Sequence, residues 1–215
     1  MQIEIWSDII CPWCYIGKRN FEQALAAFPH KEQVQIVWRS FELDPQAPAE
    51  LPGKLAQTLA DKYQVSIEDA DAMIARVSAA AHSAGLAYRL DLARTGNTLD
   101  AHRLLHHAAS KGLGDKATEC LMHAYFCAAL PVGDRTALTR LAPQFGITEA
   151  EARQVLESDA YTAAVRADEA RAAQCGIDVV PSFLIDGNIL LSGGQPVAEF
   201  SELLHQAMAQ SRKRN

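Results

Sequence analysis

The sequence predicts an α/β fold in which two sheet-forming segments are separated by a long helical one. Residues 2–8 (QIEIWSD) and 34–41 (VQIVWRSF) are rich in β-branched and aromatic residues with partial alternation, which is typical of strands. Two further apolar runs occur within residues 182–192 (SFLIDGNILLS), whereas residues 54–175 have almost wholly helical spacing. The expected order is therefore a βαβ unit, a helical insertion and a ββα unit.

The helix of the first unit is expected to run from Pro12 to about Phe28. Apolar residues recur there at the i, i+3, i+4 and i+7 spacing that gives a helix one buried face. These residues are Phe21, Ala24, Leu25 and Phe28. The segment thus connects the first two predicted strands and completes a βαβ unit.

The helical insertion is introduced by prolines and divided by capping signals. Three prolines mark the connection out of the sheet: Pro45, Pro48 and Pro52. Helix starts are indicated at Ser66 with Asp69, at Asn97, and at Thr148 with Glu151. Gly85 is placed to end the first of these helices, and the alanine-rich residues 160–175 predict a long closing helix.

The C-terminal part of the chain returns to the sheet. Asp186, Gly187 and Asn188 suit positive φ angles, so the two strands around them are expected to form a hairpin. A last helix is expected from about Val197 to Met208. We therefore expect a thioredoxin fold interrupted by an all-helical domain: residues 1–45 (βαβ), 46–159 (insertion) and 160–215 (closing helix and ββα).

Composition excludes some classes of function. The chain of 215 residues is 49% hydrophobic and 21% charged, with a net charge of −6 and no basic stripe, which argues against nucleic-acid binding. No run of 18 apolar residues predicts a membrane span, and the N-terminus lacks the pattern of a signal peptide. We expect a cytoplasmic protein, and we expect the basic tail QSRKRN to be solvated.

The stretch SDIICPWCYIGKR carries the strongest chemical signal. Between a strand and a helix, Cys11 falls near the N-cap and Pro12 at the first helical position, where its missing N–H is not needed. The helix N-terminus stabilises a thiolate at Cys11. Cys14, one turn later, is placed to attack a mixed disulfide formed at Cys11. The pair is therefore interpreted as a redox centre.

The cysteines and histidines can also be interpreted as metal ligands or as purely structural residues. A zinc site would need about four ligands, and no second CxxC is present. Cys120 and Cys127 would lie about 10 Å apart along one helix, beyond disulfide reach, and are interpreted, with Cys175, as unpaired residues of apolar helix faces. His102 and His106 have a metal-binding spacing but no third ligand nearby, so they are interpreted as flanking polar positions, and no metal is expected.

The segment VVPSF supplies a second signal. Pro181 comes just before the first returning strand, where a cis X–Pro bond would expose the backbone of Val180 beside the CPWC loop. By itself the segment fits a plain turn as well as a substrate-binding feature.

The order of four segments, CPWC, NTLDAHRLLH, VVPSFLIDG and SGGQP, resembles the cytoplasmic FrnE-like branch of the DsbA family over nearly the whole chain. The resemblance implies thiol–disulfide oxidoreductase or isomerase activity, with Cys11 as nucleophile, Cys14 as resolving cysteine and Pro181 as the cis-proline. It also places Asn97 and His102 over the active site. SGGQP adds two candidate cleft residues, Gly194 and Gln195.

Departures from the family pattern bear on activity. Trp13 stands where exported DsbA proteins usually have His, so strong oxidising power is not expected. Ser182 and Phe183 follow the cis-proline position where two aromatic residues are frequent, which implies a different groove. We expect a reductase or isomerase of disulfides in protein or small-molecule substrates, with no tightly bound cofactor and glutathione as a redox partner.

Two alternatives remain from the sequence. The 2-hydroxychromene-2-carboxylate isomerase and kappa-class glutathione transferase group resembles the chain and uses glutathione, but its members typically lack the second cysteine, here Cys14. A holdase that binds apolar segments beside Trp13 is the other alternative.

Overall fold

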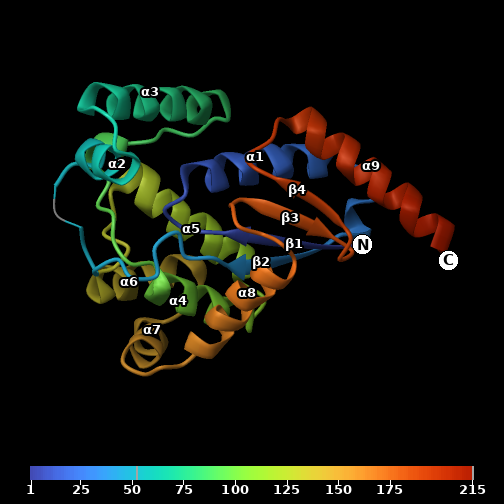
Figure 1. Ribbon diagram of the computed structural model, residues 1–215. Coiled ribbons are helices and arrows are strands. Elements are labelled where there is room, and N and C mark those ends of the chain that lie inside the picture. The colour runs from blue at the N-terminus through green and yellow to red at the C-terminus, as the bar shows by residue number, and fades with distance from the viewer. Residues whose placement is uncertain (52, 215) are drawn as a thin grey trace.

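A mixed sheet of four strands lies at the centre of the part of the chain that the computed structural model describes, residues 1–51 and 53–214 (Figure 1). The strands are β1 (Gln2–Ser7), β2 (Gln35–Ser40), β3 (Ser182–Ile185) and β4 (Ile189–Ser192), in the order β2-β1-β3-β4. β1 pairs in parallel with β2 and antiparallel with β3, with Ile5 opposite both Trp38 and Phe183. The expected βαβ and ββα units therefore form one sheet.

The predicted hairpin is confirmed. Asp186 and Gly187 have φ angles of 46° and 72°, the conformation that tight turns between strands require. The Asp186 carboxylate also accepts a hydrogen bond from the backbone N–H of Gln2 at 2.7 Å. The turn is thereby attached to the start of β1.

Alternating residues of β1 serve the two faces of the sheet. Ile3 and Ile5 lie on the face covered by α1 (Pro12–Ala27) and α9 (Val197–Arg214), which pack against each other (Figure 1). Trp6 lies in a second cluster with α8 (Thr162–Gln174), and its indole N–H donates to the Asp168 carbonyl oxygen at 2.9 Å. The closing helix thus covers the opposite face.

Six α-helices lie between β2 and α8. They are α2 (Leu55–Tyr63), α3 (Ile67–Ser83), α4 (Leu99–Ala109), α5 (Gly114–Ala128), α6 (Arg135–Leu141) and α7 (Glu149–Leu156) in the described residues. Short 3₁₀ helices occupy Lys31–Gln33, Leu90–Leu92 and Ala142–Phe145. No helix among the described residues combines the length and apolar character needed to cross a membrane.

Most of the predicted helix boundaries are found. The Ser66 hydroxyl accepts the Asp69 N–H at 3.0 Å, and Thr148 with Glu151 forms a reciprocal capping box. Asn97, expected as an N-cap, lies one residue earlier: Thr98 is the N-cap, and the Asn97 side chain accepts the Leu99 N–H at 3.0 Å.

The last helix is longer than expected. It continues to Arg214 rather than ending near Met208, because no glycine or proline follows to stop it. Pro52 and the end of the basic tail, namely Asn215 and the side chains from Arg212 on, lie outside what the structure describes.

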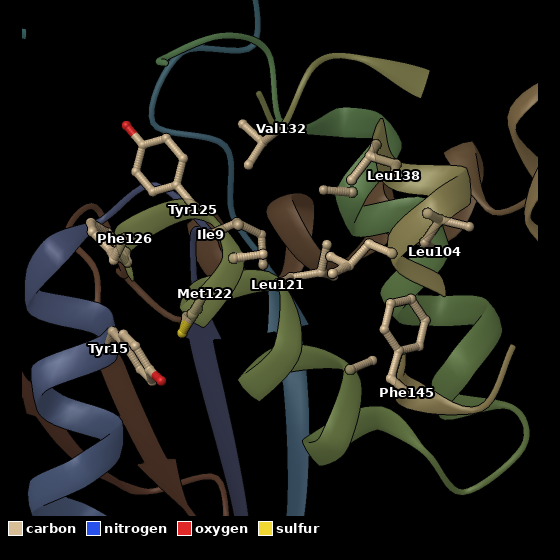
Figure 2. Close-up of a cluster of buried hydrophobic side chains, with 14 of the residues drawn as sticks. Ile9, Tyr15, Leu104, Leu121, Met122, Tyr125, Phe126, Val132, Leu138 and Phe145 are labelled. Atoms are coloured by element: carbon tan, nitrogen blue, oxygen red, sulfur yellow. The ribbon is translucent and has the colours of Figure 1, made fainter. Parts of the chain in front are cut away.

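The inserted helices share a core with the start of α1. Figure 2 shows Leu121, Met122, Tyr125 and Phe126 of α5 gathered with Ile9 and Tyr15, which flank the CPWC segment in the sequence. All six side chains are buried. The CPWC segment therefore lies where the helical core meets the sheet.

Candidate active site

The CPWC segment occupies the N-terminus of α1, as its sequence predicts. Cys11 is the N-cap with an extended backbone, φ −80° and ψ 112°, and Pro12 is the first helical residue. The Cys14 N–H donates to the Cys11 carbonyl oxygen at 3.0 Å, which closes the first turn. All five cysteines are free thiols in this structure. Cys11 thus sits at the N-terminal, positive end of the helix dipole.

The two thiols have different surroundings. Cys11 is 4% exposed and lines a cleft, and its thiol donates to the Val180 carbonyl oxygen at 3.5 Å. Cys14 is 1% exposed, and burial, followed by the adjacent Cys11, raises the pKa of its thiol. Cys14 is therefore protonated at neutral pH, whereas Cys11 is the thiol that an incoming molecule meets.

A cleft of about 390 Å³ opens in front of Cys11. Its walls come from the CPWC turn, the connection after β2, the α2–α3 pair and the turn before β3, and its apolar lining includes Trp13, Leu43, Leu59, Val77, Phe126 and Val179. Charged side chains in the described lining are Asp44, Lys62 and Asp178. The cleft is of the size and the largely apolar character common in binding sites.

Large apolar side chains stay exposed at this cleft. Trp13, Tyr63 and Val179 are 42%, 53% and 52% exposed, and each lines the cleft. They come from α1, from α2 and from the turn before β3. An apolar rim contributed by three separate segments around one thiol is typical of a surface that binds other molecules.

The Val180–Pro181 peptide bond is cis, which confirms that prediction. Val179 and Val180 line the cleft beside Cys11. Helix α1 approaches this turn closely at Gly17, where a Cβ atom would lie 3.1 Å from Pro181 Cγ and 3.1 Å from Gly194 Cα. A glycine at position 17 therefore lets the helix carrying the cysteines pack directly against the proline.

Four other residues were predicted to line the cleft: Asn97, His102, Gly194 and Gln195. None of them is among the described residues that line it. The Asn97 side chain turns to the backbone of Leu99 and Pro45. Gly194 packs against α1, where a Cβ would lie 2.8 Å from the Trp13 carbonyl oxygen, and the carbonyl of Gln195 accepts from Asn20 at 2.8 Å. Their roles are local hydrogen bonding and close packing, which their sequence positions alone could not reveal.

His102, the fourth candidate, is buried, and it was wrong to interpret the two histidines as flanking polar positions. His102 Nε2 lies 3.3 Å from the carboxylate of Asp8, which is fully buried. His106 Nε2 lies 3.1 Å from Asp168 Oδ2. Both histidines thus join α4 to carboxylates outside the insertion. In the described part of the chain, no group of three or more His, Cys, Asp or Glu is arranged to hold a metal ion.

Two further residues at the site were not found from the sequence. Asp8 accepts the Leu43 N–H at 2.7 Å as well as contacting His102. The Tyr88 hydroxyl, from the loop after α3, donates to the Pro12 carbonyl oxygen at 2.8 Å. Asp8 could have been found from the sequence, because it stands three residues before Cys11. Tyr88 could not, because its contact with Pro12 joins residues far apart in the chain.

Known proteins share this architecture. The probable DsbA oxidoreductase SCO1869 of Streptomyces coelicolor is 43% identical and superposes with a TM-score of 0.93, covering 97% of this chain and 90% of that one. The uncharacterized protein YwbO of Bacillus subtilis is 26% identical over 100% of this chain and 98% of its own length. A 2-hydroxychromene-2-carboxylate isomerase structure shares the fold, with a TM-score of 0.72 at 10% identity and complete coverage of both chains.

The match to a family model agrees with the topology and with the CPWC turn. The model of the DSBA-like thioredoxin domain covers residues 2–205, which include both sheet-forming units and the helices inserted between them. The chain therefore belongs to the DSBA-like thioredoxin domain family, whose members are thiol oxidoreductases.

Proposed function

We propose that this protein exchanges disulfides with thiol-containing partners through Cys11 and Cys14. The observation that carries the proposal is the asymmetry of the pair: Cys11 caps α1 and opens to the cleft, while Cys14 is buried behind it. An accessible attacking thiol and a shielded resolving thiol are what a two-step exchange requires.

The reaction balances without a cofactor. The Cys11 thiolate attacks one sulfur of a substrate disulfide, that S–S bond breaks, and the first substrate thiol leaves with a proton. Cys14 then loses its proton and attacks the Cys11 sulfur, which releases the second substrate thiol and leaves a Cys11–Cys14 disulfide. Two electrons pass to the substrate, and two molecules of an external thiol such as glutathione, which leave as their own disulfide, return the pair to its reduced form.

Reduction or isomerisation is the proposed direction. Trp13 brings no cationic donor to the thiolate, so the strong stabilisation of the reduced form that makes a powerful oxidant is missing from this side of the turn. A protein working among the reduced thiols of a cytoplasm would act in the same direction. Both considerations support the FrnE-like reductase or isomerase activity that the sequence resemblance implies.

The cleft supports a substrate whose sulfur is flanked by apolar groups. Its lining is mostly apolar, and the exposed side chains at its rim are Trp13, Tyr63 and Val179. Burying them against apolar neighbours of a substrate cysteine is favourable at about 25 cal/mol per Å². We therefore propose cysteines within apolar protein segments as the preferred substrates.

Trapping tests the proposal. Cys14→Ser should accumulate a mixed disulfide at Cys11 with a peptide disulfide of apolar sequence, detected by intact mass and peptide mapping, whereas Cys175→Ser should turn over as the wild type does. If alkylation followed by peptide mapping showed that Cys14 reacts before Cys11, the roles of the two cysteines would be reversed. If the wild type formed no Cys11–Cys14 disulfide in any glutathione mixture, the glutathione-dependent isomerase or transferase function would be favoured instead.

A further inference from the structure

Tyr88 reaches the CPWC turn from the inserted helices. It lies between α3 and the short helix Leu90–Leu92, and its hydroxyl donates to the carbonyl oxygen of Pro12 at 2.8 Å. Pro12 is the residue between the attacking cysteine and Trp13. One hydroxyl from the insertion therefore contacts the backbone of the redox turn itself.

The Tyr88 ring packs in a group of three aromatic rings with Phe126 and Tyr15. It stacks on Phe126 with ring centroids 4.4 Å apart and planes inclined by 16°, and on Tyr15 at 6.2 Å and 17°. The next residue, Arg89, donates its backbone N–H to the Phe126 carbonyl oxygen at 2.7 Å. Figure 2 shows Phe126 and Tyr15 beside α1, where they belong to the buried core. The position of the Tyr88 hydroxyl is therefore set by packing rather than by the bond it makes.

The hydroxyl acts as a neutral donor. Burial raises the pKa of Tyr88, and negative charge on the nearby cysteine sulfurs raises it further, so the phenol keeps its proton. A carbonyl oxygen has two lone pairs, so Pro12 can accept from Tyr88 and still serve the helix. The positive end of the O–H dipole thus points into the turn that carries Cys11.

We propose that Tyr88 is a positioning residue that holds the CPWC turn by the Pro12 carbonyl and favours the thiolate of Cys11 through the dipole of its hydroxyl. The inference rests on the proposed function, because it names the group that tunes the same cysteine pair. It assigns this contact with the CPWC turn to a residue of the insertion. Tyr88 is not among the described residues lining the cleft, so its effect falls on the reactivity of the thiol and not on substrate contact.

The test compares Tyr88→Phe with Tyr161→Phe. Each change removes one hydroxyl from a partly buried tyrosine, but the Tyr161 hydroxyl bonds to His107 at 3.2 Å and not to the CPWC turn. Iodoacetamide alkylation of Cys11, resolved by peptide mass, is measured from about pH 5 to 9. In Tyr88→Phe the profile should move up by about half a pH unit, a roughly threefold loss of rate on the rising part of the profile, which one hydrogen bond can supply.

Equilibration with glutathione gives a second readout. Because the reduced form loses stabilisation, Tyr88→Phe should hold its Cys11–Cys14 disulfide in about threefold more reducing mixtures than the wild type, whereas Tyr161→Phe should not. Thermal unfolding confirms that each variant is folded. Equal alkylation profiles in Tyr88→Phe and the wild type overturn the inference. The alkylation profile decides it even if the wild type forms no disulfide, a result that would count against the proposed function alone.

Discussion

Two regions of the molecule bury their apolar side chains to very different extents. One is the four-stranded sheet with the helices that cover it, α1, α8 and α9, here called the sheet body. The other is the α2–α3 pair. Above the sheet, Phe21, Phe183 and Phe200 form a closed aromatic group with ring centroids 4.6 to 5.6 Å apart, and each is at most 2% exposed. In α2 the buried residue is Ala60, and in α3 the buried residues are Ala70 and Ala81. The larger apolar residues of these two helices are only partly covered.

The difference separates stability from function. Leu55, Leu59, Ile74 and Val77 lie on the sides of α2 and α3 that face the cleft, opposite the CPWC turn. Apolar side chains directed toward a cleft stabilise the fold less than those in a closed core, because part of their surface stays in water. The α2–α3 pair therefore contributes mainly to the wall in front of Cys11, and the sheet body contributes mainly to folding.

The largest expected effect is on the sheet body. Phe200→Ala should lower the free energy of unfolding by about 3–5 kcal/mol, because it leaves a cavity among closely packed rings. Leu59→Ala, on the cleft wall, should lower it by about 1 kcal/mol, since Leu59 is only partly buried. Urea unfolding followed by circular dichroism measures both. Equal losses would show that the α2–α3 pair is part of the stabilising core.

The sheet body was also the more predictable region. Its strands were expected within one residue of their observed ends, because period-two alternation and turn residues act locally. The position of Cys11 and Pro12 at the N-terminus of α1 follows from the same local rules. Local patterns therefore identified the elements and the position of the redox turn.

The rest of the site depends on contacts between distant residues. Asn97 and His102 were expected in the cleft because the family resemblance places their segment over the active site, but one serves a helix start and the other a buried carboxylate. The cleft wall was not predicted, because amphipathic spacing in α2 and α3 does not say which surface covers their apolar sides. Nor does any local signal assign Tyr88 to the Pro12 carbonyl.

His102 tests whether the insertion stabilises the sheet body through one buried contact. His102→Ala should lower the free energy of unfolding by about 2–3 kcal/mol, because it removes the partner of a buried carboxylate oxygen of Asp8. His123→Ala, an exposed histidine on α5, should change it by no more than about 0.5 kcal/mol. A loss of activity in His102→Ala without a loss of stability would instead assign His102 to the chemistry.

The smallest expected effect is on stability in acid, through Glu4 on the face of the sheet that α8 covers. Glu4 on β1 is buried and accepts hydrogen bonds from Arg171 at 2.5 Å and Arg39 at 2.7 Å. The bond with Arg171, which outweighs the opposing effect of burial, lowers the pKa of Glu4 below its usual value of 4.5. Because the folded pKa is below the unfolded one, Glu4 stabilises the protein at neutral pH, and this contribution is lost as the pH falls below about 4.5.

Glu4→Gln should therefore flatten the decline in stability between about pH 6 and pH 3. The free energies of unfolding of Glu4→Gln and the wild type should differ by less than about 1 kcal/mol, because both arginines are partly exposed and water screens their ion pairs with Glu4. Urea midpoints across this range measure it. Glu50→Gln is the matched control, since Glu50 pairs with Arg94 in an ion pair that is about half exposed on both sides and that therefore contributes little. If both variants lost stability with falling pH as the wild type does, the acid sensitivity of the sheet body would come from other buried carboxylates. Asp168 is one of them: burial acts to raise its pKa, but hydrogen bonding, first with His106, lowers it overall.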